Sequence, residues 1–321
     1  MSNKTIQVLC GEPYNYSELA LKEVANFAEL VTINLTQDEF AEKALDYHVL
    51  MVRLKHKVTK DIIFKSEKLI AIISPTTGLD HIDLTAANQR DVKVFSLRGE
   101  VDFLRNIHSS AEHTFALILS LIRNIPQAFE DVKKRRWEQF PFRGYELNGK
   151  KFGILGFGRI GSKIAEYANA FGMEVLTYDP YVSKFPCYVY KCNSLQALLK
   201  ESQIFSINIP LNKSTVGLIG LKELGLLPKD SFLINTSRGD ILDEIALIEF
   251  LKSGHIKGAA IDVLKNENLI TIKEHQLVEY SLTNSNLIIT PHIGGAAWEA
   301  IEKTDIFIIK KFKKWLKKNE N

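Results

Sequence analysis

Three short stretches of the chain carry side chains suited to moving a proton beside a bound acid. They are INTSRG at 234–239, AIDV at 260–263 with Glu267 behind it, and TPHIGG at 290–295. A guanidinium pairs with a carboxylate, an imidazole passes a proton near neutral pH, and a neighbouring carboxylate orients that imidazole. Arg238, Glu267 and His292 therefore supply the groups that hydride transfer to a carbonyl needs.

Each of these residues also has a structural interpretation. Arg238 fits a surface ion pair, Glu267 a solvated loop acid, and His292 a satisfied histidine at a helix start. His113 lies on an apolar helix beside Glu112, so we expect a structural role for it. The remaining histidines have no comparable neighbours in the sequence: His48, His56, His81, His108, His255 and His275.

A glycine turn, GFGRIG at 156–161, lies between an apolar run and a helical pattern that leads to a second apolar run. Gly156 allows the tight turn, Gly158 lets the backbone approach a pyrophosphate, and Gly161 lets the helix lie close to the strand. Asp179, eighteen residues after Gly161, ends the second run, where a carboxylate accepts bonds from ribose hydroxyls and repels a 2′-phosphate. The pattern predicts an NAD site rather than an NADP site. The alternative is a strand-to-helix turn that binds no nucleotide.

Short β-branched runs alternate with helical spacing along most of the chain. The expected strands are 5–10, 31–35, 49–52, 68–74 and 92–97, and, after Asp179, 203–208, 231–235, 257–263 and 286–290. Helical patterns occur at 18–30, 37–47, 194–201, 215–226 and 242–253. Thr36 with Glu39, and Thr59, are expected helix caps. The alternation predicts parallel sheets covered by helices, one of them built around the glycine turn.

Two further helical segments have distinctive apolar patterns. Residues 109–124 form a nearly continuous apolar helix that Pro126 should stop or kink, and a second helix follows at 127–137. The segment 295–318 sets an apolar face against six lysines. Such a helix suits a membrane or nucleic-acid surface. A net charge of only +3 favours instead a terminal helix docked by its apolar face.

Length and composition indicate a globular protein of two domains. The 321 residues exceed one ordinary core, and 45% hydrophobic with 25% charged residues is average for such proteins. Cys10, Cys187 and Cys192 include no CxxC pair, so we expect neither a disulfide framework nor a metal site. The N-terminus has no signal-peptide pattern, and no apolar run reaches the roughly 18 residues of a membrane span. We therefore expect a cytoplasmic protein without membrane or nucleic-acid partners.

Together the motifs resemble the NAD-dependent D-2-hydroxyacid dehydrogenase family over nearly the whole chain, and SAEHTFALILSLIRNIPQA at 110–128 adds to the resemblance. The resemblance implies two doubly wound α/β parallel-sheet domains with a cleft between them. A flavodoxin-like substrate-binding domain would comprise 1–103 and 296–321, and a Rossmann NAD-binding domain 104–295. It also implies a homodimer built through the helices of 110–137.

The resemblance further implies a role for each motif residue. His292 is the expected acid/base, Glu267 its partner, and Arg238 the clamp on the substrate carboxylate and carbonyl. The backbone amides of Thr77 and Gly78 are expected to hold the same carboxylate. The expected cofactor-binding residues are Gly156, Gly158, Arg159, Ile160, Gly161, Tyr178, Asp179, Asn208, Ile209, Pro210, Thr236 and Asp262, the last facing the nicotinamide carboxamide.

Within the family, the phosphoglycerate dehydrogenase branch is the most similar, through RNIPQA and Trp137-Glu138. The chain differs from that branch at Leu54, Pro75 and Asn268, and its 321 residues leave no regulatory domain. We therefore expect hydride transfer between NAD(H) and a D-2-hydroxy acid or 2-keto acid, without assigning phosphoglycerate. The alternative is an NAD-binding scaffold, similar to transcriptional corepressors, that acts through partners with little turnover.

Three arginines bear on the choice of substrate. Arg98 and Arg105 lie in the loop after the last strand of the first domain, and Arg53 follows another strand of that domain. Forked guanidinium donors suit a second anionic or polar group at the far end of a substrate. The alternative is that these arginines are solvated or paired with Glu100 and Asp102.

Overall fold

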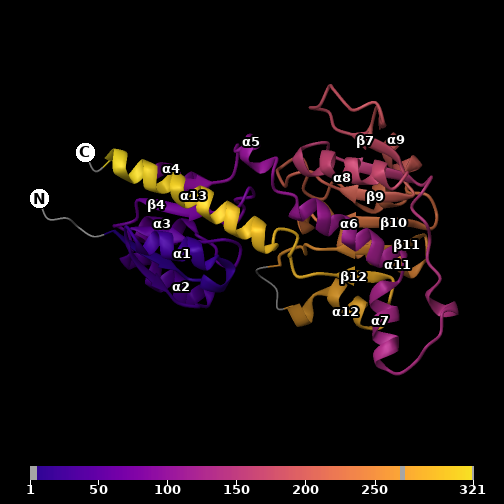
Figure 1. Cartoon of the computed structure of the whole chain (residues 1–321), viewed down its shortest axis with the longest axis horizontal. Helices are drawn as coiled ribbons and strands as arrows, with labels where there is room; N and C mark the ends of the chain where they lie inside the picture. Colours follow the sequence, from indigo (N-terminus) through magenta and orange to yellow (C-terminus); the bar gives the residue numbers. More distant parts are fainter. Residues whose placement is uncertain (1–5, 268–271, 320–321) are drawn as a thin grey trace, which may run out of the picture. The chain divides into compact units, whose positions relative to one another are not determined.

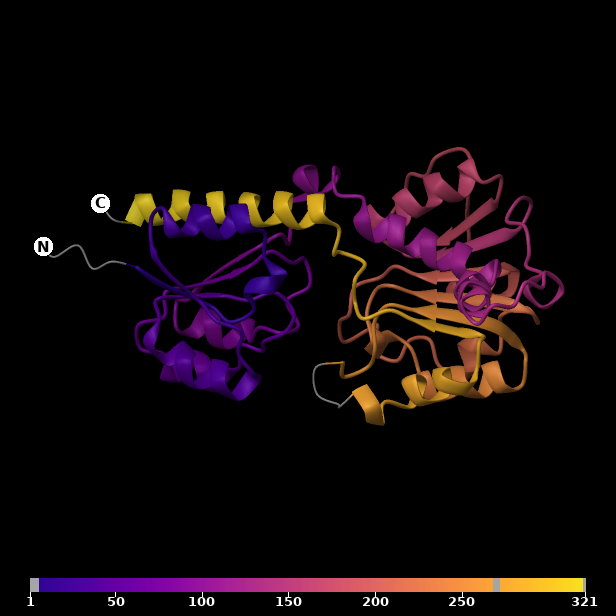
Figure 2. The same ribbon diagram turned by 60° about the horizontal axis from the view of Figure 1, so that its bottom comes forward.

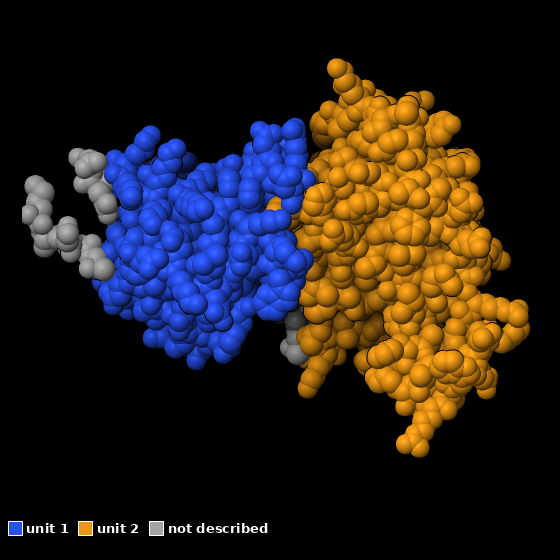
Figure 3. All heavy atoms as spheres, viewed as in Figure 1, with its two compact units in different colours: residues 1–106, 296–321 blue, residues 107–295 orange. Residues whose placement is uncertain are grey.

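The computed structural model describes residues 6–267 and 272–319, so the expected difference at Asn268 lies outside the described residues. The chain divides into two compact units, which Figure 3 colours separately. Unit 1 comprises Met1–Asn106 with Ala296–Asn321, and unit 2 comprises Ile107–Gly295. Each unit is built on its own sheet, and in both sheets every pair of neighbouring strands is parallel.

Unit 1 contains a five-stranded sheet in the order β2-β1-β3-β4-β5. Its strands are β1 (Gln7–Cys10), β2 (Glu29–Thr32), β3 (Val49–Met51), β4 (Ala71–Ser74) and β5 (Lys93–Ser96). This order is that of the flavodoxin-like doubly wound fold, so the predicted fold class of this unit is confirmed. The edge strand β2 begins earlier than predicted because its extent follows its pairing with β1, which starts at Gln7 opposite Glu29.

Helices cover both faces of this sheet, as Figure 2 shows. They are α1 (Glu18–Ala25), α2 (Gln37–Lys43), α3 (Lys60–Lys65), α4 (Leu84–Gln89), α5 (Val101–Leu104) and α13 (Trp298–Asn319). The predicted caps are confirmed: Thr36 and Glu39 form a reciprocal capping box, and the Thr59 side chain accepts from Ile62 N. Helices α2, α3 and α4 share one apolar core with the sheet, and α1 and α13 share the other.

The C-terminal helix α13 docks by its apolar face, as predicted. Ile308, Ile309 and Phe312 are fully buried against the sheet, beside α1. Two of its lysines form ion pairs within unit 1, Lys311 with Glu100 and Lys313 with Glu23. Across residues 6–267 and 272–319, no helix combines the length and the apolar character needed to cross a membrane.

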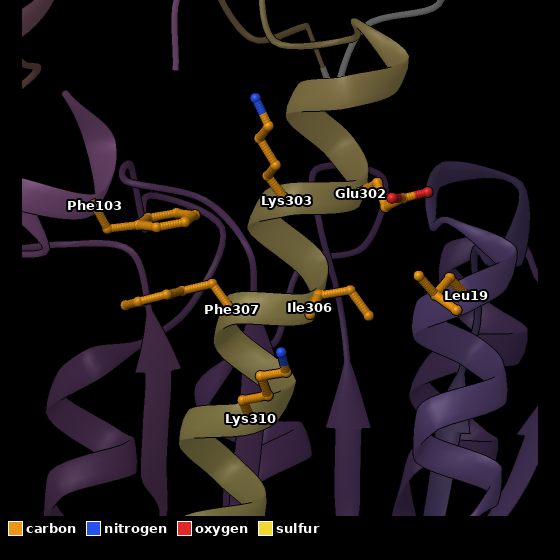
Figure 4. Close-up of a pocket in the computed structure, with 7 residues that line it drawn as sticks. All are labelled: Leu19, Phe103, Glu302, Lys303, Ile306, Phe307 and Lys310. Carbon is orange, nitrogen blue, oxygen red and sulfur yellow. The ribbon is translucent and has the colours of Figure 1, made fainter. Parts of the chain in front are cut away.

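A shallow apolar groove of about 320 Å³ runs along α13 in unit 1 (Figure 4). The rings of Phe103 and Phe307 stack at 3.9 Å on one side of it. The lining is completed by Leu19, Glu302, Lys303, Ile306 and Lys310. None of these residues belongs to the predicted functional site, so the groove is separate from the chemistry considered below.

Unit 2 contains a seven-stranded sheet in the order β12-β11-β10-β9-β6-β7-β8. Its strands are β6 (Lys151–Leu155), β7 (Glu174–Tyr178), β8 (Val189–Lys191), β9 (Ile204–Ile207), β10 (Ser231–Asn235), β11 (Ile256–Ile261) and β12 (Leu287–Ile289). Counted from β6, this is the Rossmann order 3-2-1-4-5-6 with one further strand. The predicted Rossmann fold is confirmed, and the order reverses between β6 and β9, where such folds bind their ligands.

The helices of unit 2 also lie on both faces of its sheet (Figure 1). They are α6 (Ser109–Ile122), α7 (Ile125–Lys133), α8 (Arg159–Ala170), α9 (Leu195–Glu201), α10 (Leu221–Leu224), α11 (Glu244–Lys252) and α12 (Gln276–Thr283). Helices α6 and α8 share one core with the sheet, and α9 to α12 share the other. The nearly continuous apolar helix predicted at 109–124 is therefore buried within the core of this unit.

Two details near α6 differ from the prediction. Helix α6 ends at Ile122, because Asn124 adopts a left-handed conformation with φ of 53°. Pro126 then lies in the first turn of α7, where its missing N–H has no helical partner to lose. The proline therefore begins the second helix rather than ending the first.

Candidate active site

His292 and Glu267 form the closest contact between titratable side chains in the predicted site. His292 follows β12, Glu267 follows β11, and the imidazole Nδ1 lies 2.6 Å from Glu267 Oε1. Their side chains are 22% and 27% exposed, so both can be reached from solvent. The contact to Nδ1 leaves Nε2 as the nitrogen that can exchange a proton with a bound molecule.

Asp262 fixes the backbone turn that carries His292. The turn is left-handed at His292, with φ of 55°. Asp262 Oδ1 accepts from Ile293 N at 2.9 Å and from Thr290 Oγ1 at 2.6 Å, and its Oδ2 accepts from Gly294 N at 2.8 Å. Burial would raise the pKa of Asp262, but these hydrogen bonds and one from His113 outweigh it and lower that pKa.

Helix α6 contributes two side chains that the sequence did not mark as functional. His113 Nε2 lies 3.1 Å from Asp262 Oδ1, and Thr114 Oγ1 lies 2.8 Å from Thr236 Oγ1. His113 therefore has the structural role expected for it. Its imidazole contacts the Asp262 carboxylate, which in turn fixes the backbone turn that carries His292. In the sequence, only the position of His113 in the SAEHT motif, which is part of the family resemblance, connects it with the site; it lies 149 residues before Asp262.

Arg238 lies in a turn that packs directly on the segment leading to Glu267. Its position is held by Asn235, whose side chain donates to Arg238 O at 2.9 Å. A Cβ on Gly239 would lie 2.1 Å from the carbonyl carbon of Leu264 and 2.2 Å from Lys265 N. Only glycine fits there, so the loops that carry Arg238 and Glu267 are in backbone contact.

In the glycine turn between β6 and α8, two positions leave no space for a side chain because backbone atoms of the protein lie too close. Gly156 has φ of 92°, and a Cβ there would lie 2.7 Å from Asn208 O. A Cβ on Gly161 would lie 2.1 Å from Gly156 O. A Cβ on Gly158 would meet no described atom within 4 Å. The need for glycine at that position fits the approach of a pyrophosphate rather than protein packing.

Other predicted cofactor residues surround this turn. Asp179, after β7, accepts from Phe157 N at 2.8 Å through Oδ2 and from Tyr181 N at 2.8 Å through Oδ1. Each carboxylate oxygen retains acceptor capacity, so these bonds leave room for ribose hydroxyls. Burial lowers the pKa of the Arg159 guanidinium, which donates to Ile107 O at 3.4 Å.

The remaining predicted cofactor residues lie on neighbouring loops. Among described residues, the buried Oδ1 of Asn208 has no hydrogen-bond partner. The Ser237 hydroxyl donates to Ile209 O, which joins the loop after β9 to the loop after β10. Half-buried Ile160, Tyr178 and Ile209 and exposed Pro210 complete the set. The glycine turn and the acid at a strand end are groups that Rossmann folds use to bind a dinucleotide.

The predicted substrate residues of unit 1 differ in their surroundings. Thr77 and Gly78 follow β4, and Thr76 Oγ1 orders their loop by donating to Gly78 O at 2.7 Å. Arg53 pairs with the buried Asp305 and lies over the Tyr16 ring at 5.5 Å from its centroid.

Arg105 and Arg98 are both exposed. Arg105 pairs with Asp102 at 3.2 Å, the alternative considered from the sequence, whereas Glu100 pairs with Lys311. Within the part of the chain that the structure describes, Arg98 takes part in no ion pair.

Comparisons with known proteins agree with this geometry. Residues 115–294 match the family described as D-isomer specific 2-hydroxyacid dehydrogenase, NAD binding domain. The chain is 35% identical to the D-3-phosphoglycerate dehydrogenase of Methanocaldococcus jannaschii, over 97% of this chain and 58% of that protein. It is 34% identical to the hydroxypyruvate reductase of Thermotoga maritima, over 90% of this chain and 91% of that protein.

A solved structure is similar over the same extent. The D-lactate dehydrogenase from Aquifex aeolicus, complexed with NAD and lactic acid, aligns with a TM-score of 0.83 at 28% identity, covering 97% of this chain and 95% of that one. The chain spans about half the length of several curated phosphoglycerate dehydrogenases that it matches. The matched NAD-binding domain nevertheless covers more than half of the chain. The chain therefore belongs to the D-isomer specific 2-hydroxyacid dehydrogenase family.

Proposed function

We propose that this chain is an oxidoreductase that transfers a hydride between NAD(H) and a D-2-hydroxy acid or 2-keto acid pair. The observation that carries the proposal is the 2.6 Å contact between His292 Nδ1 and Glu267 Oε1, in the unit that also holds the glycine turn. An imidazole oriented by a carboxylate is the arrangement that general acid–base catalysis uses. Family membership and the activities named for its relatives support the same reaction.

In the direction of reduction, His292 Nε2 donates its proton to the keto oxygen of the substrate. Glu267 stabilises the charged imidazolium before that transfer and holds the ring through Nδ1. Arg238 pairs with the substrate carboxylate and polarises the carbonyl. NADH, when bound, supplies the hydride that reaches the carbonyl carbon. In the reverse direction, His292 accepts the hydroxyl proton.

We assign the cofactor and the substrate to different parts of the chain. Residues 104–295 bind NAD through the predicted cofactor residues, and Asp179 disfavours the 2′-phosphate of NADP. Residues 1–103 with 296–321 bind the substrate, whose carboxylate is held by the amides of Thr77 and Gly78. Among the candidate arginines, Arg98 is the best placed to meet a second polar group, because Arg53 and Arg105 already have carboxylate partners.

The apolar surface of α7 supports a homodimer. Helix α7 has no buried residue, and its Phe129 is 62% exposed; in the segment that follows the helix, Trp137 is 84% exposed and Phe140 72%. Large apolar side chains left exposed mark an interaction surface, and closed symmetric pairs are the commonest assembly. We expect Phe129→Glu to convert a dimer into monomers in size-exclusion chromatography with light scattering. Leu282→Glu, at an equally exposed apolar site on α12, serves as the control.

The cysteines bear on the compartment. All three are free: Cys10 is buried, Cys187 is exposed and Cys192 is intermediate. Burial raises the pKa of the Cys10 thiol to about 12, so that thiol is unreactive. Free thiols fit a reducing compartment, and we propose the cytoplasm.

Across the described residues, no group of three or more His, Cys, Asp or Glu side chains is arranged to hold a metal.

Turnover with purified protein tests the proposed reaction. A panel of 2-keto acids is mixed with NADH, the absorbance of NADH is followed, and the chirality of the product is determined. His292→Ala should lower kcat by at least about 100-fold, the usual contribution of an acid–base group, while NADH affinity measured by fluorescence stays within about twofold. His255→Ala, at a histidine outside the site, is the matched control. A wild type that binds NADH but reduces no keto acid would favour the scaffold alternative.

A further inference from the structure

A buried carboxylate and a buried imidazole meet behind the loop that carries Glu267. Glu244, the first residue of α11, is 9% exposed, and His275, which directly precedes α12, is 4% exposed. His275 Nε2 lies 3.4 Å from Glu244 Oε2. The proposed reaction uses neither residue, and no sequence motif singles out His275. Buried ionisable side chains are uncommon unless they have specific partners.

Their shared partner is a single residue, Lys265, through its backbone. Lys265 N donates to Glu244 Oε1 at 2.7 Å, and His275 Nε2 lies 3.2 Å from Lys265 O. Because a carbonyl oxygen can only accept, the imidazole hydrogen is on Nε2, within reach of both Lys265 O and Glu244. The two side chains therefore hold both polar groups of one residue's backbone.

The clamped residue is two positions before Glu267 in the sequence. Gly239 packs against the same stretch, with its would-be Cβ 2.2 Å from Lys265 N. Glu267 is in turn tied back to this stretch, because Leu264 N donates to Glu267 Oε2 at 3.3 Å. Glu267 Oε1 then meets His292 Nδ1 at 2.6 Å. A continuous chain of contacts thus leads from the buried pair to the acid–base histidine.

We propose that Glu244 and His275 are positioning residues, which hold the 264–267 loop so that the Glu267 carboxylate meets His292. The inference rests on the proposed function, since it assigns the pair a role in the relay of Glu267 and His292. Its geometric basis is that the two anchors come from different helix starts and converge on the backbone of Lys265.

The buried environment of the Glu244–His275 contact is unfavourable for ionisable side chains. Burial raises the pKa of Glu244, although the hydrogen bond from Lys265 N and the proximity of His275 and of the Lys265 ammonium oppose that shift; Asp240 adds to it. The His275 Nδ1 is also buried, with no hydrogen-bond partner among the described residues. A pair that served only to fill the core would be replaced at lower cost by apolar side chains. Its polar groups are explained by the loop that they hold.

A double-mutant cycle tests this role. In the wild-type background, Glu244→Ala and His275→Leu should each lower kcat roughly 10- to 100-fold, the effect of displacing a reacting group by about an ångström. In the Glu267→Gln background, the same substitutions should change kcat by less than about threefold, because the group that they position has already been removed. KM for NADH should stay unchanged in all four variants.

Conservative variants and matched controls separate positioning from stability. Glu244→Gln keeps an acceptor for Lys265 N and should recover most of the lost kcat. Glu249→Ala removes an exposed acid from the same helix, and should have no effect. His255→Leu removes a similar imidazole contact, to Leu227 O at 2.8 Å in another part of unit 2, and should lower thermal stability without a loss in kcat.

The outcomes distinguish the two proposals. Equal losses of kcat from Glu244→Ala in the wild-type and Glu267→Gln backgrounds would show a general structural effect and overturn the inference. Unchanged kcat in Glu244→Ala and His275→Leu would overturn it as well. If instead Glu267→Gln itself leaves turnover and its pH profile unchanged, the relay fails and the proposed function must be revised.

Discussion

Asp262 holds His292 from two directions at once. The backbone N–H of His292 donates to Asp262 O at 2.9 Å, while the Asp262 carboxylate accepts from the two backbone N–H groups that follow His292. A non-glycine residue at positive φ is uncommon, and it persists where its surroundings fix it. The aspartate that the family resemblance assigns to the nicotinamide therefore also fixes the backbone of the proposed acid–base residue.

This relationship predicts how stability depends on pH. Asp262→Asn should lower the free energy of unfolding at pH 7 by about 2–4 kcal/mol, since hydrogen bonds to a buried carboxylate are lost or reversed. The folded-state pKa of Asp262 is lowered, so the unfolded chain binds the proton more tightly. The stabilisation is complete above the ordinary value of about 4 and is lost as pH falls through the lower folded value.

Urea unfolding of the two proteins between pH 7 and pH 2.5 measures this difference. The gap between wild type and Asp262→Asn should be constant above about pH 4 and should narrow below it. Asp230→Asn, at an exposed carboxylate with a surface contact of 3.6 Å to Lys257, should show little difference at any pH. A gap that widens on acidification would mean that the carboxylate is protonated in the folded protein.

Removing the charge of Glu267 should change the pH dependence of turnover. In Glu267→Gln, the His292 imidazolium loses the anion that lies 2.6 Å away, so its charged form is no longer stabilised by that partner. Keto-acid reduction needs the protonated imidazole, so its decline on the alkaline side should begin at lower pH than in the wild type. Oxidation, which needs the neutral ring, should extend to lower pH.

Rates in both directions between pH 5 and pH 10 provide the measurement. Glu249→Gln, an exposed acid on α11, is the control for a general change in charge. Profiles of wild type and Glu267→Gln that superimpose after scaling would exclude Glu267 from the relay.

Replacing Asp179 should narrow the preference for NAD over NADP. The carboxylate follows β7 and is expected to repel a 2′-phosphate, and Asp179→Ser removes both its charge and its bulk. We expect the ratio of kcat/KM for NADH over NADPH to fall by about tenfold or more. Because Asp179 also binds Phe157 N and Tyr181 N, Asp179→Asn is needed as a variant that removes the charge and keeps the size. Wild-type protein that uses both cofactors equally would refute this assignment.

The placement of many candidate residues was predictable because local geometry determines it. The glycine spacing at 156–161 follows from one turn between a strand and a helix, and Asp179 follows from the end of the next strand. Arg238, Glu267 and His292 come after neighbouring parallel strands, whose carboxyl ends must lie at the same edge of the sheet. The two sheet orders likewise follow from regular alternation of strands and helices.

The supporting contacts were not predictable, because they depend on distant parts of the chain. His113 meets Asp262 across 149 residues, and Arg53 meets Asp305 across 252 residues. The SAEHT motif draws attention to His113, but nothing in the local sequence names the partner of His113 or of Arg53. Short edge elements were missed for a different reason: β8 has only three residues, VYK, too few to show a period.

The last prediction concerns the far end of the substrate. We expect Arg98 to contact a distal acid, phosphate or hydroxyl, because it is exposed and the other two candidate arginines already pair with Asp305 and Asp102. A charged contact of this kind should raise kcat/KM for such keto acids over pyruvate by about tenfold or more. Arg98→Ala should remove that preference and leave the rate with pyruvate unchanged.

Arg105→Ala is the matched control, since it removes an arginine of the same loop region whose partner is Asp102. It should leave the ratio between the two substrates unchanged, as the salt bridge lies at the surface and contributes little. Arg98→Lys tests the forked geometry, because a lysine keeps the charge but cannot bind an anion with two parallel donors. If pyruvate is the best substrate of the wild type and Arg98→Ala changes no ratio, then the second binding group lies elsewhere or the substrate has no distal anion.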